Sequence, residues 1–348
     1  MKAKTFSLTV IAGTIALLLI FAAGIYMIDP FCQYHMPINE MKPVFSRGTQ
    51  NYLNPGLAKN SDYNSVVLGS SVSENFYASQ FSKVFDCNAI KLPSAGGYST
   101  NYKEIMTVVF REKKIKNVFF SLDEFALWND PEKPNQELPL YLYDTNPLND
   151  VSYLLNKSSL NYVYDMIRQN HSGTAIDYDK AYNWQNEFTF SKERTLKYYQ
   201  RPELHKTNSK NKYIKKFGKN LENITTFIEG NPDTTFYIFL PPYSIIWWDG
   251  ITRDGNLDAV LNALTVSMKQ LAGYKNVKLF YFQNIPEIKD LDNYRERMHF
   301  TETMNAEMVV DMNKNKYRVT EKDVDKVLAD MKKTVKKFDF SVFFPENK

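Results

Sequence analysis

Five short apolar runs alternate with longer helical stretches along this chain, and this alternation constrains the fold more than any other feature. The runs are Val66–Leu68, Ala89–Leu92, Val118–Leu122, Phe236–Leu240 and Val277–Phe282. They are rich in β-branched and aromatic residues, which favour strands. They are also apolar on both faces, as strands are when helices cover both sides of a parallel sheet. The sequence therefore predicts an α/β domain with a central, mainly parallel sheet of about five strands.

The segments between these runs show the periodicity of amphipathic helices. We expect crossover helices at Asn101–Glu112 and Leu257–Leu271, because parallel neighbours need such connections. Thr320–Lys337 is predicted to be a C-terminal amphipathic helix with Thr320 as its N-cap. The connection after the third run is far longer than the others. Residues 128–233 are therefore predicted to form an insertion that covers the site or binds a partner.

The N-terminal run Phe6–Ile28 carries no charged side chain and has the length, ~20 residues, that a helix needs to cross a bilayer. Lys2 and Lys4 precede it, so the positive-inside rule leaves residues 1–5 in the cytoplasm and exports the chain after Asp29. A cleaved signal peptide is the alternative, but its apolar core is shorter, about 7–15 residues. We therefore expect a single-pass signal anchor over 6–28 in the cell membrane. An irregular lead-in over 29–63 and one α/β domain over 64–348 follow it.

The composition excludes two classes of function. Lysine and arginine number 43 against 39 acidic residues, a net charge of +4, which is too mild for a nucleic-acid-binding protein. The two cysteines, Cys32 and Cys87, and the four scattered histidines show no metal-ligand spacing. We expect no metal, no other cofactor and no disulfide between these two cysteines.

A candidate nucleophile follows the first run. Gly69 ends the run abruptly, and Ser70 and Ser71 come directly after it. Glycine permits a sharp turn at the end of a strand, and the carboxyl ends of strands are where open α/β sheets place their sites. There the N–H of Ser71 could face an oxyanion. The alternative is an ordinary helix start with an N-cap serine.

A carboxylate and a histidine occur together after the last run. Glu296 precedes His299 by three positions in the segment Asp290–Phe300. A serine hydroxyl becomes a good nucleophile when a neutral imidazole accepts its proton, and a carboxylate must hold that imidazole in the correct tautomer. The order Ser71 early, Glu296 and His299 late, predicts a catalytic triad.

These residues resemble the motifs of the SGNH (GDSL-type) hydrolases and their membrane-anchored relatives that modify cell-surface polysaccharides. Gly69-Ser70-Ser71 is similar to the first block of the family, with Ser71 in the place of the nucleophile. Gly96, or its neighbour Gly97, matches the oxyanion-hole glycine of the second block, and Glu296-Arg297-Met298-His299 matches the last. The resemblance covers roughly 63–312. It implies a flavodoxin-like three-layer α/β sandwich with the backbone N–H groups of Ser71 and Gly96 holding the oxyanion.

Two positions depart from the family pattern. Glu296 stands where the family has aspartate, which leaves Asp292 or Asp290 as an alternative acid. The third block normally supplies an asparagine to the oxyanion hole, but Asp123 and Glu124 follow the third run here. Losing one such donor costs about 3–4 kcal/mol of transition-state stabilisation. Anchored relatives that transfer acyl groups are similar in lacking it, and Asp123 is expected to have a structural or positioning role.

The resemblance implies a serine esterase or O-acyltransferase that acts on cell-envelope polysaccharide through an acyl-Ser71 intermediate. A transferase with one membrane helix would need a multi-spanning partner to deliver its acyl donor. The alternative is a non-catalytic protein of the same fold that holds glycan or a biosynthetic partner. After the fourth run, Tyr243 is expected near the same sheet edge, and Trp247 and Trp248 either line a sugar-binding cleft or pack beneath the insertion.

Overall fold

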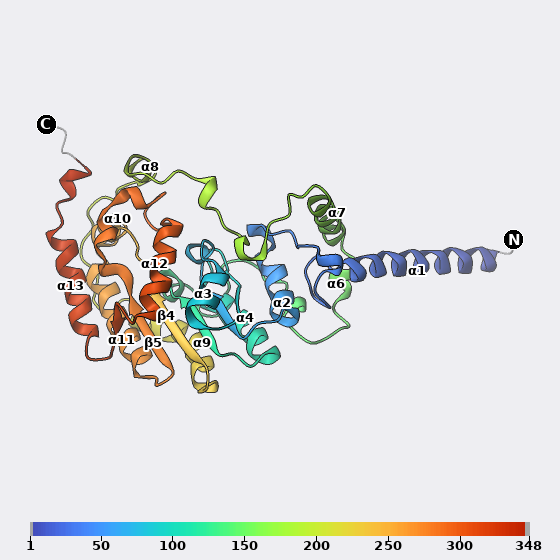
Figure 1. Cartoon of the computed structure of the whole chain (residues 1–348), viewed down its shortest axis with the longest axis horizontal. Helices are drawn as coiled ribbons and strands as arrows, with labels where there is room; N and C mark the ends of the chain where they lie inside the picture. Colours follow the sequence, from blue (N-terminus) through green and yellow to red (C-terminus); the bar gives the residue numbers. More distant parts are fainter. Residues whose placement is uncertain (1–2, 345–348) are drawn as a thin grey trace.

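The computed structural model describes residues 3–344 and contains one six-stranded sheet (Figure 1). Its order is β2-β1-β3-β4-β5-β6. The five predicted runs all form strands and pair in parallel, which confirms the predicted α/β class. The strands are β1 (Ser65–Leu68), β2 (Ala89–Lys91), β3 (Asn117–Ser121), β4 (Thr235–Leu240), β5 (Val277–Tyr281) and β6 (Arg318–Val319).

The sheet has one strand more than predicted. β6 pairs antiparallel with β5, placing Val319 opposite Leu279. A strand of two residues, of which only Val319 is buried, leaves no alternating pattern in the sequence. The sheet is therefore mixed, with a short antiparallel strand at one edge.

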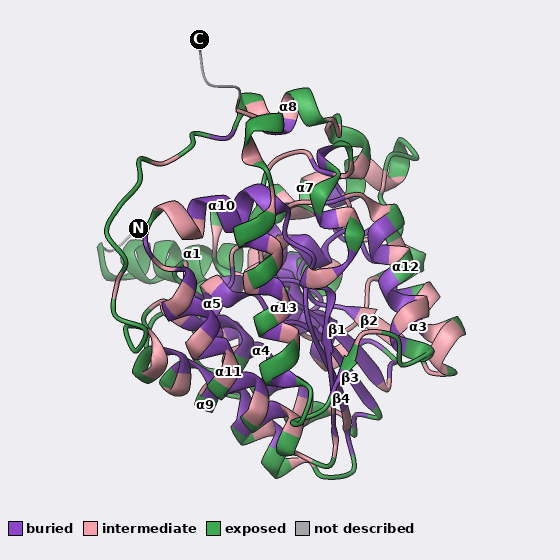
Figure 2. Cartoon of the chain, turned by 90° about the vertical axis from the view of Figure 1, so that its left-hand side faces the viewer, coloured by how far each residue is buried: buried purple, intermediate pink, exposed green. Residues whose placement is uncertain are grey.

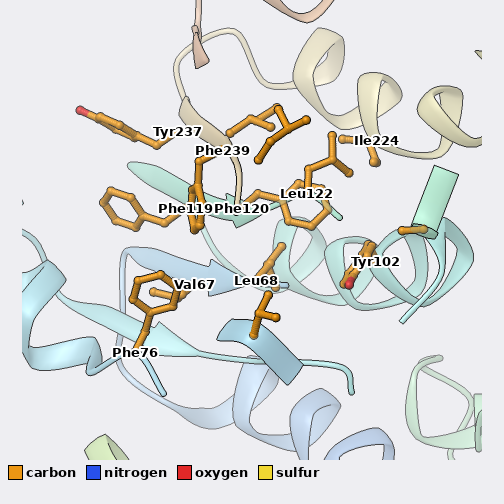
Figure 3. Packing of buried hydrophobic residues seen from close by; sticks show 14 of the residues in the cluster. Val67, Leu68, Phe76, Tyr102, Phe119, Phe120, Leu122, Ile224, Tyr237 and Phe239 are labelled. Atoms are coloured by element: carbon orange, nitrogen blue, oxygen red, sulfur yellow. The ribbon is translucent and has the colours of Figure 1, made fainter. Parts of the chain in front are cut away.

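The core of the sheet is built from aromatic and β-branched side chains. Val67, Phe119 and Tyr237 lie at paired positions on three adjacent strands. The rings of Phe119 and Tyr237 are 5.0 Å apart (Figure 3). The ring of Phe81 packs 4.5 Å from that of Phe119. Burying such side chains contributes roughly 1.5–3 kcal/mol each, which fixes the strands and thereby the loops at their ends.

Helices cover both sides of the sheet. In Figure 2, α9 and α11 lie on one side and α3 and α12 on the other. Successive contacts join α2, α4, α9, α11 and α13 into one group, while α3 packs on α12. The helices are α1 (Ala3–Ile28), α2 (Gln50–Asn60), α3 (Ala78–Phe85), α4 (Ser99–Glu112), α5 (Glu124–Trp128), α6 (Val151–Leu154), α7 (Lys157–His171), α8 (Lys192–Lys197), α9 (Ile214–Gly230), α10 (Ile245–Arg253), α11 (Leu257–Gly273), α12 (Glu302–Asn313) and α13 (Val324–Lys337). The two predicted crossover helices are α4 and α11.

Thr320 is not the N-cap of the C-terminal helix. The helix begins at Val324 with Asp323 as its N-cap residue, and both the N–H and the hydroxyl of Thr320 donate to the Asp323 carboxylate, at 3.0 and 2.5 Å. These bonds and the hydrogen bond from the N–H of Asp323 to the carbonyl of Thr320 form a turn, and the helix begins after it.

The connection between β3 and β4 contains α5 to α9. Its middle part, with α6 and α7, extends away from the sheet to contact α1, whereas α9 packs against α4 and α11. The last part of the segment 128–233 is therefore a crossover helix of the sheet rather than a cover over the site.

The end of the N-terminal helix α1 is bonded to the domain. It is long and apolar enough to cross a membrane, and most of it is exposed. At its end the Asp29 carboxylate accepts hydrogen bonds from the N–H groups of Gln33, Tyr34 and His35 and from the Tyr153 hydroxyl of α6. The following lead-in packs its apolar residues into the core through α2, so residues 29–63 belong to the folded domain.

Candidate active site

The turn after β1 requires glycine. Gly69 has φ +149°, a conformation that side-chain-bearing residues rarely adopt, and a Cβ there would lie 2.7 Å from Cβ of Ser121 and 3.0 Å from Ser73. The Gly69 carbonyl accepts a hydrogen bond of 2.8 Å from the N–H of Ser94. The turn therefore fixes the residues after β1 against the end of β3 and against the loop after β2.

The two serines after this turn have different roles. Ser70 is fully buried and is the N-cap of the short 3₁₀ helix Ser71–Ser73, with its hydroxyl accepting from the N–H of Val72 at 3.5 Å. Capping thus belongs to Ser70, and Ser71 is free to point its hydroxyl elsewhere. Of the two interpretations of this motif, the N-cap applies to Ser70, and the candidate nucleophile remains Ser71.

Ser71, His299 and Glu296 form a continuous hydrogen-bonded chain. The Ser71 hydroxyl oxygen lies 2.6 Å from Nε2 of His299, and Nδ1 of the same ring lies 2.5 Å from Oε1 of Glu296. The N–H groups of His299 and Met298 donate to that same oxygen, at 2.8 and 3.2 Å. This is the geometry in which an imidazole can take a proton from a serine while a carboxylate holds the opposite ring nitrogen.

The environment of Glu296 keeps it ionised. Burial acts to raise its pKa, but the hydrogen bonds and charge of His299, together with the N–H groups of Met298 and His299, outweigh burial and hold the pKa below its ordinary value. An ionised Glu296 can only accept, so it favours the tautomer of His299 that carries its proton on Nδ1 and leaves Nε2 free for Ser71.

The loop that carries Glu296 and His299 is held at both ends. Tyr294 and Phe300 form an antiparallel bridge, and the Tyr294 hydroxyl donates to the carbonyl of Pro242 at 2.6 Å. Ser244 donates through its N–H and its hydroxyl to the carbonyl of Arg297, at 3.1 and 2.7 Å. The segment after β4 therefore supports the loop. The tight turn brings the carboxylate of Glu296, three residues before His299, against the imidazole.

The alternative acids lie elsewhere. Asp292 and Asp290 are exposed, and their carboxylates accept from backbone N–H groups, those of Lys192 at 2.6 Å and of Asp292 at 3.1 Å. Neither carboxylate contacts His299 through a hydrogen bond in the described part of the chain. The structure places Glu296, rather than Asp290 or Asp292, against the His299 imidazole. The Asp290 carboxylate closes a local turn, and that of Asp292 accepts from the N–H of Lys192 at the start of α8.

The two glycines of the second block differ in what their N–H groups do. The N–H of Gly97 donates to the carbonyl of Ser94 at 2.8 Å within the turn. Across residues 3–344 neither the N–H of Gly96 nor that of Ser71 donates a hydrogen bond. Gly96 has φ +64°, and the Asn135 side chain holds this loop by donating to the carbonyl of Ala95 at 2.9 Å. Of the two glycines, only Gly96 therefore has its N–H available for a substrate oxygen.

The two acids that follow β3 are buried. Asp123 is fully buried and accepts a hydrogen bond from the Tyr243 hydroxyl, which ties the ends of β3 and β4 together. Burial raises its pKa to about 6, and the hydrogen bond from Tyr243 opposes this. The next residue, Glu124, is also fully buried and accepts from the Gln283 amide, and burial raises its pKa to about 8. Asp123 thus has the expected structural position at the sheet edge.

Trp184 is the site residue that sequence reasoning missed. Its indole N–H donates to the carbonyl of Ser71 at 3.1 Å, and its ring meets the His299 imidazole edge-on, with centroids 5.2 Å apart. The guanidinium of Arg295 lies 4.6 Å from the Trp184 ring and 3.9 Å from the Phe188 ring. Trp184 comes from the long β3–β4 connection, whose sequence carries no signal of where it folds back.

The other tryptophans near this edge pack into the core. Trp247 and Trp248 are nearly or fully buried, and Trp247 stacks on Trp128 with 5° between the rings. Packing was one of the two expectations for them and is confirmed, whereas the alternative of a sugar-binding cleft is wrong. Cys32 and Cys87 are free thiols, and within residues 3–344 no cluster of three or more His, Cys, Asp or Glu side chains is placed to hold a metal.

Comparison of the sequence with known protein families finds no matching family. Comparison with curated proteins likewise finds no relative. The function of this chain must therefore be argued from the geometry of Ser71, His299 and Glu296.

Proposed function

We propose that this chain is a serine esterase or O-acyltransferase of the SGNH kind that acts on cell-envelope polysaccharide. The observation that carries the proposal is the chain of two short hydrogen bonds from Ser71 through His299 to Glu296. Nucleophile, base and orienting carboxylate are the three components that acyl transfer through serine needs.

In the proposed reaction, Ser71 attacks the ester carbonyl while His299 Nε2 accepts its proton. The N–H groups of Ser71 and Gly96 stabilise the oxyanion. His299 then gives the proton to the leaving alcohol, and an acyl-Ser71 ester remains. Water or a sugar hydroxyl then attacks this ester while His299 accepts its proton, and His299 returns that proton to Ser71 as the acyl–Ser71 bond breaks. Water makes the enzyme a hydrolase and a sugar hydroxyl makes it a transferase.

The sheet topology supports this proposal. Its first five strands have the order 2-1-3-4-5, which is the order of flavodoxin-like sheets. We accordingly propose a flavodoxin-like three-layer arrangement in which part of the β3–β4 connection, through Trp184, covers the site. Ser71 follows the carboxyl end of β1, where such folds place their ligands.

The proposed setting is the outer face of the cell membrane. We propose that α1 is an uncleaved anchor, with its N-terminus in the cytoplasm because Lys2 and Lys4 precede it. A substrate or acyl donor at the membrane surface would then be within reach. A transferase would receive its acyl group from a multi-spanning partner, since one helix cannot carry a donor across the bilayer.

A non-catalytic role is the second candidate, and Asp123 favours it. A buried carboxyl that accepts from Tyr243 stands where the family has an asparagine donor, so the side-chain part of the oxyanion hole is missing. A protein of this kind would hold glycan or a biosynthetic partner without turnover.

Ester hydrolysis by the full-length chain in detergent tests the proposal. We expect the wild type to release acetate from 4-nitrophenyl acetate and from an O-acetylated polysaccharide, and Ser71→Ala and His299→Ala each to lower kcat by at least about 10³-fold. Envelope glycan acylation should change in a strain that carries Ser71→Ala. No ester turnover above the Ser71→Ala variant, with unchanged acylation in that strain, would favour the non-catalytic role.

A further inference from the structure

Helix α7 has apolar side chains on its solvent side. Leu160, Tyr164 and Ile167 are 44%, 66% and 45% exposed. Their spacing of four and then three residues places them on one face of the helix. The opposite side is already buried, since Met166 is fully buried and Tyr162 packs on the core. One side of α7 therefore packs on the core. Large apolar residues on its other side are typical of a surface that is covered by a partner or a membrane.

The segment just before α7 also exposes apolar side chains. Leu148 is 85% exposed, and Val151 and Leu155 at the two ends of α6 are also exposed. We name these residues and the α7 stripe the α6–α7 face, which consists of Leu148, Val151, Leu155, Leu160, Tyr164 and Ile167.

The α6–α7 face belongs to the helices that contact α1. Both α6 and α7 pack against α1 (Figure 1), and Figure 1 shows them at the end of the domain from which α1 projects. The Asp29–Tyr153 hydrogen bond of 2.7 Å and the contact of the Phe31 and Tyr162 rings, 5.0 Å apart, fix α6 and α7 to the end of α1. These contacts join α6 and α7 to the end of α1 from which the domain begins.

The contact also reaches some way along α1. Phe21, Ile25 and Ile28 share one side of α1 and are shielded, Ile25 completely. At 1.5 Å per residue, Phe21 lies about 10 Å before Ile28, while the whole charge-free run spans about 34 Å against a hydrocarbon thickness of about 30 Å. If α1 crosses a bilayer, the part of the domain that packs against Phe21 lies at or below the level of the lipid headgroups.

We propose that the α6–α7 face lies in the interfacial layer of the same bilayer that α1 spans. Helices that bind there bury their apolar face about 5–10 Å deep, and tyrosines such as Tyr164 on α7 and Tyr26 on α1 are common at that level. The membrane thus covers the exposed stripe and holds the domain at one orientation and height above the lipid. This proposal depends on α1 crossing the membrane and is independent of any catalytic activity.

Depth-dependent fluorescence quenching tests the proposal on the full-length chain in phosphatidylcholine nanodiscs. Tyr164→Cys, made in a Cys87→Ser background, is labelled with an environment-sensitive fluorophore, since Cys32 is fully buried. Leu204→Cys, at a 74% exposed position outside the α6–α7 face, is the matched aqueous control, and Leu17→Cys in the middle of α1 is the control for the hydrocarbon. Ile167→Cys repeats the test at a second position of the stripe.

We expect lipids with a doxyl group near the headgroup to quench the labels at 164 and 167 at least twofold more than the label at 204. Quenching at 17 with equal quenching at 164, 167 and 204 would overturn the proposal, because α1 would then be inserted and the α6–α7 face in water. Absence of quenching at 17 would also overturn it, since the chain would not span the bilayer. Thermal unfolding of each variant in detergent checks that the domain remains folded.

Discussion

The hydroxyl oxygen of Ser71 lies 2.6 Å from Nε2 of His299, although 228 positions separate the two residues in the sequence. Each residue is positioned by its own local structure. Ser71 is directed by the Gly69 turn and by Ser70, which takes the capping role. His299 is held by a loop fastened to the segment after β4 through Tyr294 and Ser244.

The turn before Ser71 should not tolerate a side chain. We expect Gly69→Ala to destabilise the chain by about 2–5 kcal/mol, because the new Cβ would overlap Ser121 and the backbone conformation disfavours it. Gly48→Ala is the matched control, since its Cβ would meet nothing closer than 3.9 Å, and it should change stability by less than about 1 kcal/mol. Denaturant unfolding in detergent measures both, and equal stability of the two variants would show that the Gly69 turn is not constrained.

Ester hydrolysis should depend on the negative charge of the Glu296 carboxylate. We expect Glu296→Gln to lower kcat by about 10³- to 10⁴-fold, because an amide no longer selects the tautomer that leaves Nε2 free. Glu296→Asp should lose less, since it keeps the charge one methylene further from His299. Asp292→Asn, at an exposed acid bonded to the N–H of Lys192, should leave ester hydrolysis unchanged. A larger loss in Asp292→Asn than in Glu296→Gln would move the acid to Asp292.

Stability should fall with pH because of Glu124. Burial raises the pKa of its carboxyl to about 8 in the folded chain, whereas the unfolded chain has the ordinary value near 4.3. Between these values the folded state binds more protons. The contribution of Glu124 is therefore complete below about pH 4 and is lost as pH rises to about 8, at no more than about 1.4 kcal/mol per pH unit.

Glu124→Gln should reduce this slope, because a neutral amide can still accept from Gln283. Burial also raises the pKa of Asp123 to about 6. The stability of the variant should therefore still fall, by a smaller amount, between about pH 4 and 6. Unfolding free energies at pH 5, 6.5 and 8 measure the slopes. The exposed acid variant Glu321→Gln should keep the slope of the wild type. If the unfolding free energies of the wild type and Glu124→Gln changed equally with pH, Glu124 would be ionised in the folded chain.

Much of this architecture is predictable because it depends on local patterns. Runs such as Val66–Leu68 are apolar on both faces, which marks buried parallel strands, and the spacing of Glu296 and His299 places both in one turn. β6 was not predictable, since two residues are too few to show the alternation of apolar and polar side chains that marks a strand. The delayed start of α13 depends on a hydrogen bond between Thr320 and Asp323 that helix periodicity does not reveal.

The surroundings of the site were less predictable, since they depend on long-range packing. Nothing near Trp184 in the sequence indicates that its indole reaches the Ser71 carbonyl. Which of Gly96 and Gly97 has a free N–H depends on one hydrogen bond within a turn, from the N–H of Gly97 to the carbonyl of Ser94. The acid was also left open, because the contact of Asp292 with the N–H of Lys192 spans 100 positions and the contact of Glu296 with His299 is seen only in the fold.

Covalent labelling of Ser71 tests the central claim most directly. The full-length chain in detergent is treated with a fluorophosphonate, and the labelled peptide is identified by mass spectrometry. We predict that the probe modifies Ser71, that Ser71→Ala abolishes labelling and that Ser70→Ala, at the capping serine, retains it. Labelling of Ser70 instead, or none in a folded wild type, would contradict the assignment of Ser71 as an activated nucleophile.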